Sequence, residues 1–248
     1  MIRLWAIGLL FGFIFPVMGQ QIGRMETDRP DQTECPFIVR QGFMQVEMGF
    51  NAAHAGGQTS FLFPTTLIKY GLHPRFELRY VSTLAKNFDS PLSYNAEAIG
   101  FKWAITSGNR WFPRTSVISH YQVSNLNRDE SERNTLPHSM ADIVLTSQIE
   151  FNDTFGIGYN LGTEFHTNGN LEGIYRIAPN AILGKKGYAY VELFGRYPSA
   201  DTDQWLDAGY AHYLNEHVKL DVSAGRSLTH RDEYYVALGI SFRVQLFR

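Results

Sequence analysis

The stretch EYYVALGISFR at residues 233–243 alternates between two kinds of side chain. One face carries Tyr234, Val236, Leu238, Ile240 and Phe242, and the other carries Glu233, Tyr235, Ala237, Gly239, Ser241 and Arg243. Successive side chains of a β-strand point to opposite faces of the sheet. The stretch therefore predicts a strand with one apolar face and one small or polar face.

The same alternation recurs upstream, at residues 218–225, 155–166 and 99–105, and it begins near Gly42. Short and long connections between the predicted strands alternate along the chain. The short ones lie at 72–74, 107–109, 152–153, 184–187 and 214–217, and the long ones at 51–59, 84–91, 126–138, 167–170, 199–203 and 228–232. Outer-membrane barrels have short periplasmic turns and longer external loops. The pattern predicts an all-β, antiparallel transmembrane barrel of about 12 strands over residues 42–248, with both chain ends in the periplasm.

The composition separates this architecture from its competitors. No run of about 18 apolar residues follows Gly19, which argues against membrane-spanning helices. Aromatic residues make up 14% of the chain and gather on the apolar faces, as aromatic girdles require, while the opposite faces carry Gly, Ala, Ser and mixed charges. A soluble β-sandwich or barrel also alternates and remains the alternative, although its polar face would carry more Lys, Glu and Thr.

The N-terminal residues predict export. Arg3 precedes an apolar stretch from Leu4 to Phe15 that Pro16 ends, so residues 1–19 are predicted to be a signal peptide and the mature chain to begin at Gln20. A retained membrane anchor is the alternative. The single cysteine, Cys35, excludes an internal disulfide.

Several function classes find no support in the residues. A net charge of −2 without a basic cluster argues against nucleic-acid binding. The eight histidines are scattered and no zinc spacing occurs, so neither a metal site nor a cofactor is expected. Membrane lipid and an unidentified small solute are the partners expected, and the sequence does not fix the oligomeric state.

An enzyme is also not expected. His166-Thr167-Asn168-Gly169 faintly resembles the His-x-Ser-Asn-Gly pattern of outer-membrane phospholipase A, but the hydroxyl is a threonine and is out of place. Ser119 and His120 are adjacent in a predicted strand and point to opposite faces, so they cannot pair directly. A lipid hydrolase dependent on His166 is kept as the third hypothesis.

Polar side chains on the inward faces are the candidate functional residues. The predicted lumen residues are Glu47, Lys69, Glu77, Arg79, Lys102, His120, Gln122, Glu150, Glu164, Arg176, Glu192, Arg196, Asp207, Lys219, Asp221 and Arg243. They could select solutes in a narrow pathway, or they could pair and fill the lumen. We favour the pathway.

Residues 20–41 form a polar lead-in segment with charges of both signs. The charges Asp28, Arg29, Asp31, Glu34 and Arg40 suit a polar interior, with Asp28 beside Arg29 and Glu34 near Arg40. The segment is therefore a candidate lumen plug, and a disordered periplasmic tail is the alternative.

The segment ETDRPDQTE at residues 26–34 resembles the N-terminal motif of an exported bacterial family labelled "transporter" and named for a MetA pathway of phenol degradation. Stretches at 66–72, 76–79, 158–162, 206–210 and 220–225 are also similar, so the resemblance covers nearly the whole mature chain. It implies an outer-membrane barrel that passes small, aromatic compounds. The chain departs from the usual aromatic terminus of such barrels, because Arg248 follows Phe247.

These observations predict an outer-membrane channel for passive passage of small molecules, with aromatic or apolar compounds as candidates. The alternative is a structural or surface-interaction barrel without an open pore, whose long loops carry the activity.

Overall fold

The computed structural model describes residues 23–87, 93–109, 111–123, 139–197 and 204–247. The predicted signal peptide and the long loop at 126–138 lie outside these residues. Within them, no helix is long and apolar enough to span a bilayer.

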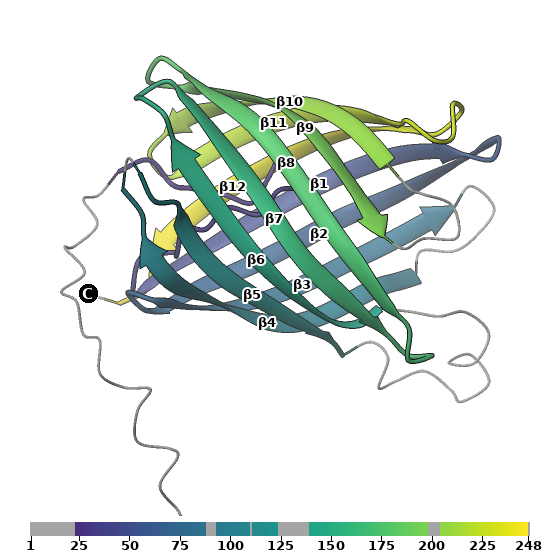
Figure 1. Cartoon of the computed structure of the whole chain (residues 1–248), viewed down its shortest axis with the longest axis horizontal. Coiled ribbons are helices and arrows are strands. Elements are labelled where there is room, and N and C mark those ends of the chain that lie inside the picture. Colours follow the sequence, from purple (N-terminus) through teal and green to yellow (C-terminus); the bar gives the residue numbers. More distant parts are fainter. Residues whose placement is uncertain (1–22, 88–92, 110, 124–138, 198–203, 248) are drawn as a thin grey trace, which may run out of the picture.

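Twelve antiparallel strands close into a barrel, as predicted (Figure 1). They are β1 (Phe43–Ala55), β2 (Gln58–His73), β3 (Phe76–Asn87), β4 (Ser93–Ser107), β5 (Arg114–Gln122), β6 (Ser139–Glu150), β7 (Phe155–His166), β8 (Leu171–Leu183), β9 (Gly187–Tyr197), β10 (Gln204–Asn215), β11 (Val218–Ser227) and β12 (Tyr234–Gln245). Each strand pairs with its neighbours in sequence, and β12 pairs with β1 to close the barrel. Closure leaves no unpaired sheet edge, which a bilayer requires.

The closing strand has the two faces that its sequence predicts. Tyr234 and Leu238 are 51% and 55% exposed, whereas Tyr235 and Ala237 are buried on the lumen side. The register opposite β1 brings Gly239 against Gly49, so two glycines face each other on the lumen side of the closing seam. The alternation in sequence therefore maps directly onto lipid-facing and lumen-facing sides.

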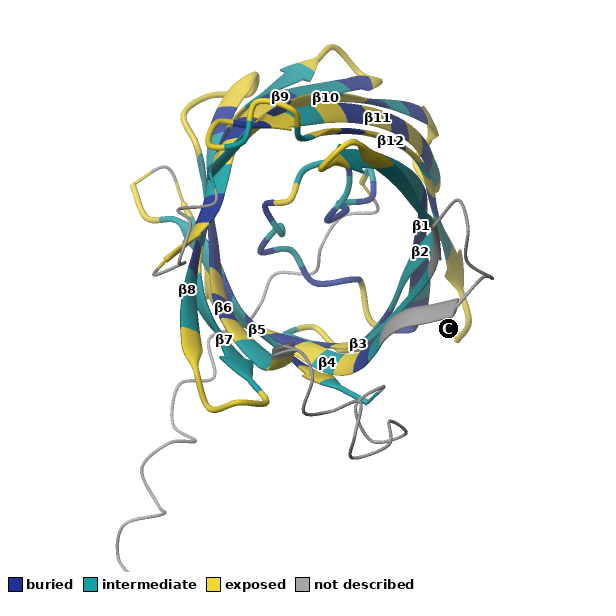
Figure 2. Cartoon of the chain, turned by 90° about the vertical axis from the view of Figure 1, so that its right-hand side faces the viewer, coloured by how far each residue is buried: buried dark blue, intermediate teal, exposed yellow. Residues whose placement is uncertain are grey.

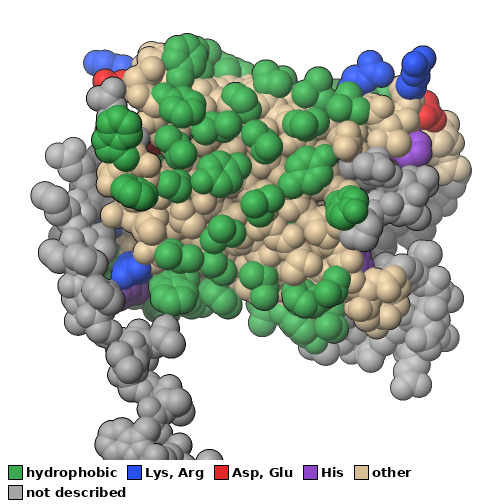
Figure 3. Space-filling view, viewed as in Figure 1, with side chains coloured by type: hydrophobic (Ala, Val, Ile, Leu, Met, Phe, Trp, Pro, Cys, Tyr) green, Lys and Arg blue, Asp and Glu red, His purple; other side chains and the backbone are tan. Residues whose placement is uncertain are grey.

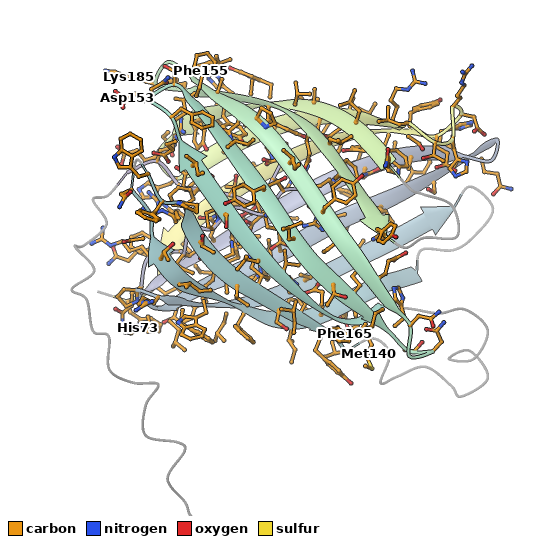
Figure 4. All side chains as sticks on the ribbon, in the orientation of Figure 1. His73, Met140, Asp153, Phe155, Phe165 and Lys185 are labelled. Atoms are coloured by element: carbon orange, nitrogen blue, oxygen red, sulfur yellow. The ribbon has the colours of Figure 1, made fainter. Side chains whose placement is uncertain are left out.

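The outer surface carries a belt of apolar side chains (Figure 3), and exposed aromatic side chains form a rim near each end of the barrel. One rim lies at the barrel end that holds the C-terminus, where Figure 4 places Phe155, Asp153 and Lys185. The exposed aromatic side chains of that rim are Trp111, Phe112, Phe151, Phe155 and Phe247, and those of the opposite rim include Phe63, Tyr197 and Tyr234. Aromatic rims around an apolar band are typical of transmembrane barrels.

One predicted long connection is wrong. Residues 51–59 were expected to form a loop, but β1 continues to Ala55 and β2 begins at Gln58. Gly56 and Gly57 have φ values of 58° and 75°, which permit a two-residue hairpin turn. The polar residues around this turn gave the sequence the appearance of a loop.

Leu238 provides a test of the lipid-facing belt. Although its side chain is exposed in the isolated chain, Leu238→Arg should lower the free energy of unfolding by about 2–4 kcal/mol in a bilayer, because the charge would lie in the apolar belt. Trp111→Arg, at the rim, should cost only about 0–1 kcal/mol. Urea titration in lipid vesicles would measure both, and equal effects would contradict this placement of the belt.

Candidate functional site

Residues 23–41 lie inside the barrel as an irregular loop (Figure 2). Both ends of this segment lie at the barrel end that holds the C-terminus. There the Met25 amide donates to the Glu216 carbonyl over 3.2 Å, and the Gly42 amide donates to the Gly71 carbonyl over 2.9 Å. Between these anchors the chain rises into the lumen. We call residues 23–41 the inserted loop.

Asp28 is the charged centre of the inserted loop. Its carboxylate lies 3.0 Å from Lys69 Nζ, 3.0 Å from Arg79 Nη1 and 3.1 Å from Lys102 Nζ. These three cations come from β2, β3 and β4, and all of them are buried. Burial alone would raise the pKa of Asp28, but Lys102, Lys69 and Arg79 outweigh burial and hold this pKa well below its usual range. One ionised carboxylate thus joins the loop to three strands.

Arg29 and Glu34 of the inserted loop pair with the barrel wall and not with other charges of the loop. Arg29 Nη2 lies 2.9 Å from Asp221, and Glu34 lies 3.2 Å from Arg79 Nη2. Arg40 is exposed, with its guanidinium 5.7 Å from the ring centre of Phe43. The sequence neighbours Asp28 and Arg29, and likewise Glu34 and Arg40, therefore bind different partners.

Asp31 lies near two groups of β9. The Tyr188 hydroxyl donates to its carboxylate over 3.0 Å. Burial, together with the nearby carboxylate of Glu192, raises the pKa of Asp31 well above its usual range. The lumen thus disfavours the charged form of Asp31.

Carboxylates of the wall accept hydrogen bonds from the loop backbone. Glu47 accepts from the amides of Asp28 and Arg29, each at 3.0 Å. Glu192 accepts from the Gln32 amide, and Glu77 accepts from the Val39 amide, each at 2.7 Å. An irregular backbone can be buried only if its polar groups find such partners.

Donors of the wall bind the loop carbonyls in the same way. Lys102 Nζ donates to the Cys35 carbonyl, and the Ser116 hydroxyl donates to the Pro36 carbonyl, each over 2.7 Å. Lys219 Nζ, at the opposite wall, donates to the Arg29 carbonyl. Because these contacts use main-chain atoms, the wall recognises the path of the loop more than its side chains.

Two glycines make room for the Arg29 side chain. A Cβ atom at Gly49 or at Gly239 would collide with the Arg29 guanidinium. These are the glycines that face each other across the seam between β1 and β12. The wall is therefore shaped around the inserted loop as well as charged to bind it.

The predicted lumen residues fall into three groups. Those buried against the inserted loop or against one another are Glu47, Lys69, Glu77, Arg79, Lys102, His120, Glu192, Asp207, Lys219 and Asp221. Glu150 and Arg243 lie at the barrel end that holds the C-terminus, and Gln122, Glu164, Arg176 and Arg196 lie toward the other end. His120 accepts from Arg79 Nε over 3.0 Å and contacts Asp142 at 3.1 Å, so it belongs to the same network.

Three neutral side chains that bind the inserted loop were not among the predicted lumen residues. Asn160 and Ser116 are fully buried, and both bind the loop backbone. Gln45 donates to the Glu26 carbonyl over 2.7 Å. All three lie on the inward phase of the alternation, which could have identified them, but the predicted lumen residues were charged groups, His120 and Gln122.

Two cavities lie at opposite ends of the lumen. One of about 460 Å³ is lined by the turns after β4 and β6, with Phe37 and Arg114. The other, of about 420 Å³, is lined by Gln32 of the inserted loop and by Arg176, Phe194, Trp205 and Tyr235. The inserted loop contributes a residue to each cavity and lies between them.

Three potential metal ligands meet beside Arg196, which lines the second cavity. Ligand atoms of Glu164, His166 and Glu172 lie within 4.8 Å of one another. Arg196 contacts Glu172 at 3.4 Å and Glu164 at 3.5 Å, so a guanidinium already neutralises this cluster. We assign no metal to it.

The groups considered for hydrolysis are placed as follows. His166 Nε2 lies 3.4 Å from Glu172. Ser119 donates to the Asp142 carbonyl over 2.8 Å, whereas the adjacent His120 is buried in the lumen. Ser119 and His120 thus do not pair.

Asp28→Ala should release the inserted loop. Removing this carboxylate leaves Lys69, Arg79 and Lys102 buried without their shared partner, a change that costs about 3–5 kcal/mol for buried pairs. We expect a glutamate-specific endoprotease to cleave after Glu34 roughly a hundredfold faster in this variant. Arg40→Gln, which removes an exposed charge of the same loop, should leave the rate unchanged. Equal rates in Asp28→Ala and in the unaltered protein would show that Asp28 does not hold the loop.

Known structures share this architecture. No family model and no curated protein matches the chain. An outer-membrane channel from Pseudomonas putida F1 is similar over 84% of this chain and 97% of its own, with a TM-score of 0.58 and 9% identity. The KdgM porin (TM-score 0.54, 10% identity, 79% and 98% of the two chains) and the NanC porin (0.51, 9%, 80% and 98%) are also similar. At these identities the likeness concerns the fold, which is that of an outer-membrane β-barrel.

Proposed function

We propose that this protein is an outer-membrane channel for passive passage of small molecules, and that the inserted loop closes it. The observation that carries the proposal is the pair of cavities of about 460 and 420 Å³ at the two ends of one lumen, with the loop between them. A solute could enter either cavity, and displacement of the loop would join the two.

The contacts of the loop suit a gate that opens without unfolding the barrel. Between the anchors they are made by wall side chains, such as Glu47, Lys102 and Ser116, and the described loop contributes only one isolated bridge, Gln41 with Gly71, to the sheet. If the loop withdrew, the strand ladders would remain intact, and water could solvate the wall charges. The two anchors at the periplasmic end give the direction of withdrawal.

The resemblance to the MetA-pathway transporter family is part of this proposal. Its most specific stretch, residues 26–34, includes Asp28, Arg29 and Glu34, whose charges bind the wall. The charges of the wall limit which residues can occupy positions 26–34. This limit gives a physical reason why the motif is more specific than the rest of the resemblance. Transport of aromatic or apolar solutes is what this kinship implies.

A sealed structural barrel is the second candidate. The triple contact of Asp28 favours it, because moving that carboxylate exposes three cations at once. The two candidates differ in one property, since only the channel requires the inserted loop to move.

A reversible lock on the loop distinguishes them. A Cβ atom at Gly158 would lie 3.1 Å from Thr33 Cγ2, close to the distance of about 3 Å from Cβ to the partner sulfur in a disulfide. We expect Thr33→Cys with Gly158→Cys, in a Cys35→Ser background, to form a disulfide between loop and wall. Liposomes should then leak small solutes in reductant and not after oxidation.

Controls complete this experiment. Cys35→Ser alone should behave alike in both redox conditions, and heat-modifiable migration should show a folded barrel in every variant. Asp28→Ala should leak more than the unaltered protein. No leakage from reduced, Asp28→Ala or loop-deleted barrels that are folded would favour the sealed barrel and contradict the channel.

A further inference from the structure

Three aromatic side chains form one wall of the second cavity. Phe194 of β9 and Trp205 of β10 are paired in register, and their rings stack with centroids 6.2 Å apart and an interplanar angle of 13°. Tyr235 of β12 continues the wall, with its ring centroid 5.9 Å from that of Trp205. Such a surface offers the face of a π-system to a planar ligand.

The backbone of β11 permits this wall. Gly225 lies in register between Asp207 and Tyr235, and a Cβ atom there would collide with the Tyr235 ring. Asp207 accepts hydrogen bonds from the hydroxyls of Tyr235 and Tyr190. The ring that bridges from β10 to β12 is therefore held in place before any ligand arrives.

Arg176 lines the same cavity beside the aromatic wall. It is paired in register with Phe194, and its side chain is 20% exposed. Its contacts within the described residues both use Nη1, at 3.3 Å from Asn160 and 3.9 Å from Glu34. Glu34 lies closer to Arg79, at 3.2 Å, and so neutralises Arg176 only in part. A guanidinium has five N–H donors, and its planar fork matches a carboxylate.

The second arginine of the cavity has a different role. Arg196 contacts Glu164 and Glu172 at the rim, so its charge is balanced by the wall. Arg176 is thus the cation whose charge a ligand in the cavity would meet. Gln32 of the inserted loop completes the lining.

We propose that this cavity binds a small aromatic carboxylate, with its ring on Phe194, Trp205 and Tyr235 and its carboxylate on Arg176. A neutral hydrocarbon would use the rings and leave the half-buried Arg176 guanidinium with only the partial neutralisation by Glu34, whereas an aliphatic acid would use Arg176 alone. The inference deepens the proposed function, because it names a substrate class for the same lumen. A volume of about 420 Å³ accommodates a single-ring acid together with water.

Calorimetric titration of the folded, full-length protein in detergent with benzoate tests this site. We expect saturable binding that Arg176→Gln and Trp205→Leu each weaken about tenfold or more. The first variant removes the contact to the carboxylate, and the second removes part of the contact to the ring. Arg176→Lys should also weaken binding, because it keeps the charge and loses the fork. Arg75→Gln and Trp103→Leu, which change an arginine at a turn and a tryptophan on the lipid face, are matched controls and should bind benzoate as the unaltered protein does.

Two results would overturn the assignment. One is the lack of saturable benzoate binding by a barrel that migrates as folded. The other is benzoate binding that survives Arg176→Gln and that toluene displaces, which would make the cavity a neutral apolar site. The titration involves no transport, so benzoate binding without liposome leakage would contradict the channel alone, and leakage without binding would contradict the aromatic-acid site alone.

Discussion

An irregular chain buried in a barrel must have its main-chain hydrogen bonds satisfied, and this constraint organises the lumen. Each strand already uses its own backbone groups in the ladders, so between the two anchors side chains of the wall bind the backbone of the inserted loop. Glu47, Glu77 and Glu192 accept from its amides, and Lys102, Lys219 and Ser116 donate to its carbonyls. The charged lining is therefore a binding site for a segment of the same chain.

The same constraint explains why both signs of charge occur in the lumen in similar number. Amides require acceptors and carbonyls require donors, so a lumen that holds a peptide needs carboxylates and cations together. Asp28 then supplies the countercharge that Lys69, Arg79 and Lys102 would otherwise lack. A mixed lining of this kind fits a lumen closed by its own chain, and a pathway requires that the chain move.

Alternation in the sequence was enough to predict the barrel. A strand that faces lipid on one side and a lumen on the other must alternate apolar residues with small or polar ones along its length. The outward phase of β12 and the buried Glu47, Lys69 and Lys102 followed from it. The hairpin at Gly56 and Gly57 did not, since polar strand ends resemble loops. The partners of Asp28 and Glu34 also could not be predicted, because they lie on β2 to β4 and β8, and alternation gives the face of a residue but not its neighbours across the lumen.

The central claim is that the wall holds the inserted loop by its backbone, and amide hydrogen exchange of the reconstituted, unaltered protein tests it most directly. The amides of Asp28, Arg29, Gln32 and Val39 belong to no strand, yet each donates to a buried wall carboxylate. We predict that these four exchange slowly, at rates closer to those of the strand ladders than to those of a free chain. Exchange at the rate of an unfolded peptide would contradict the account, because it would mean that the loop does not reside in the lumen.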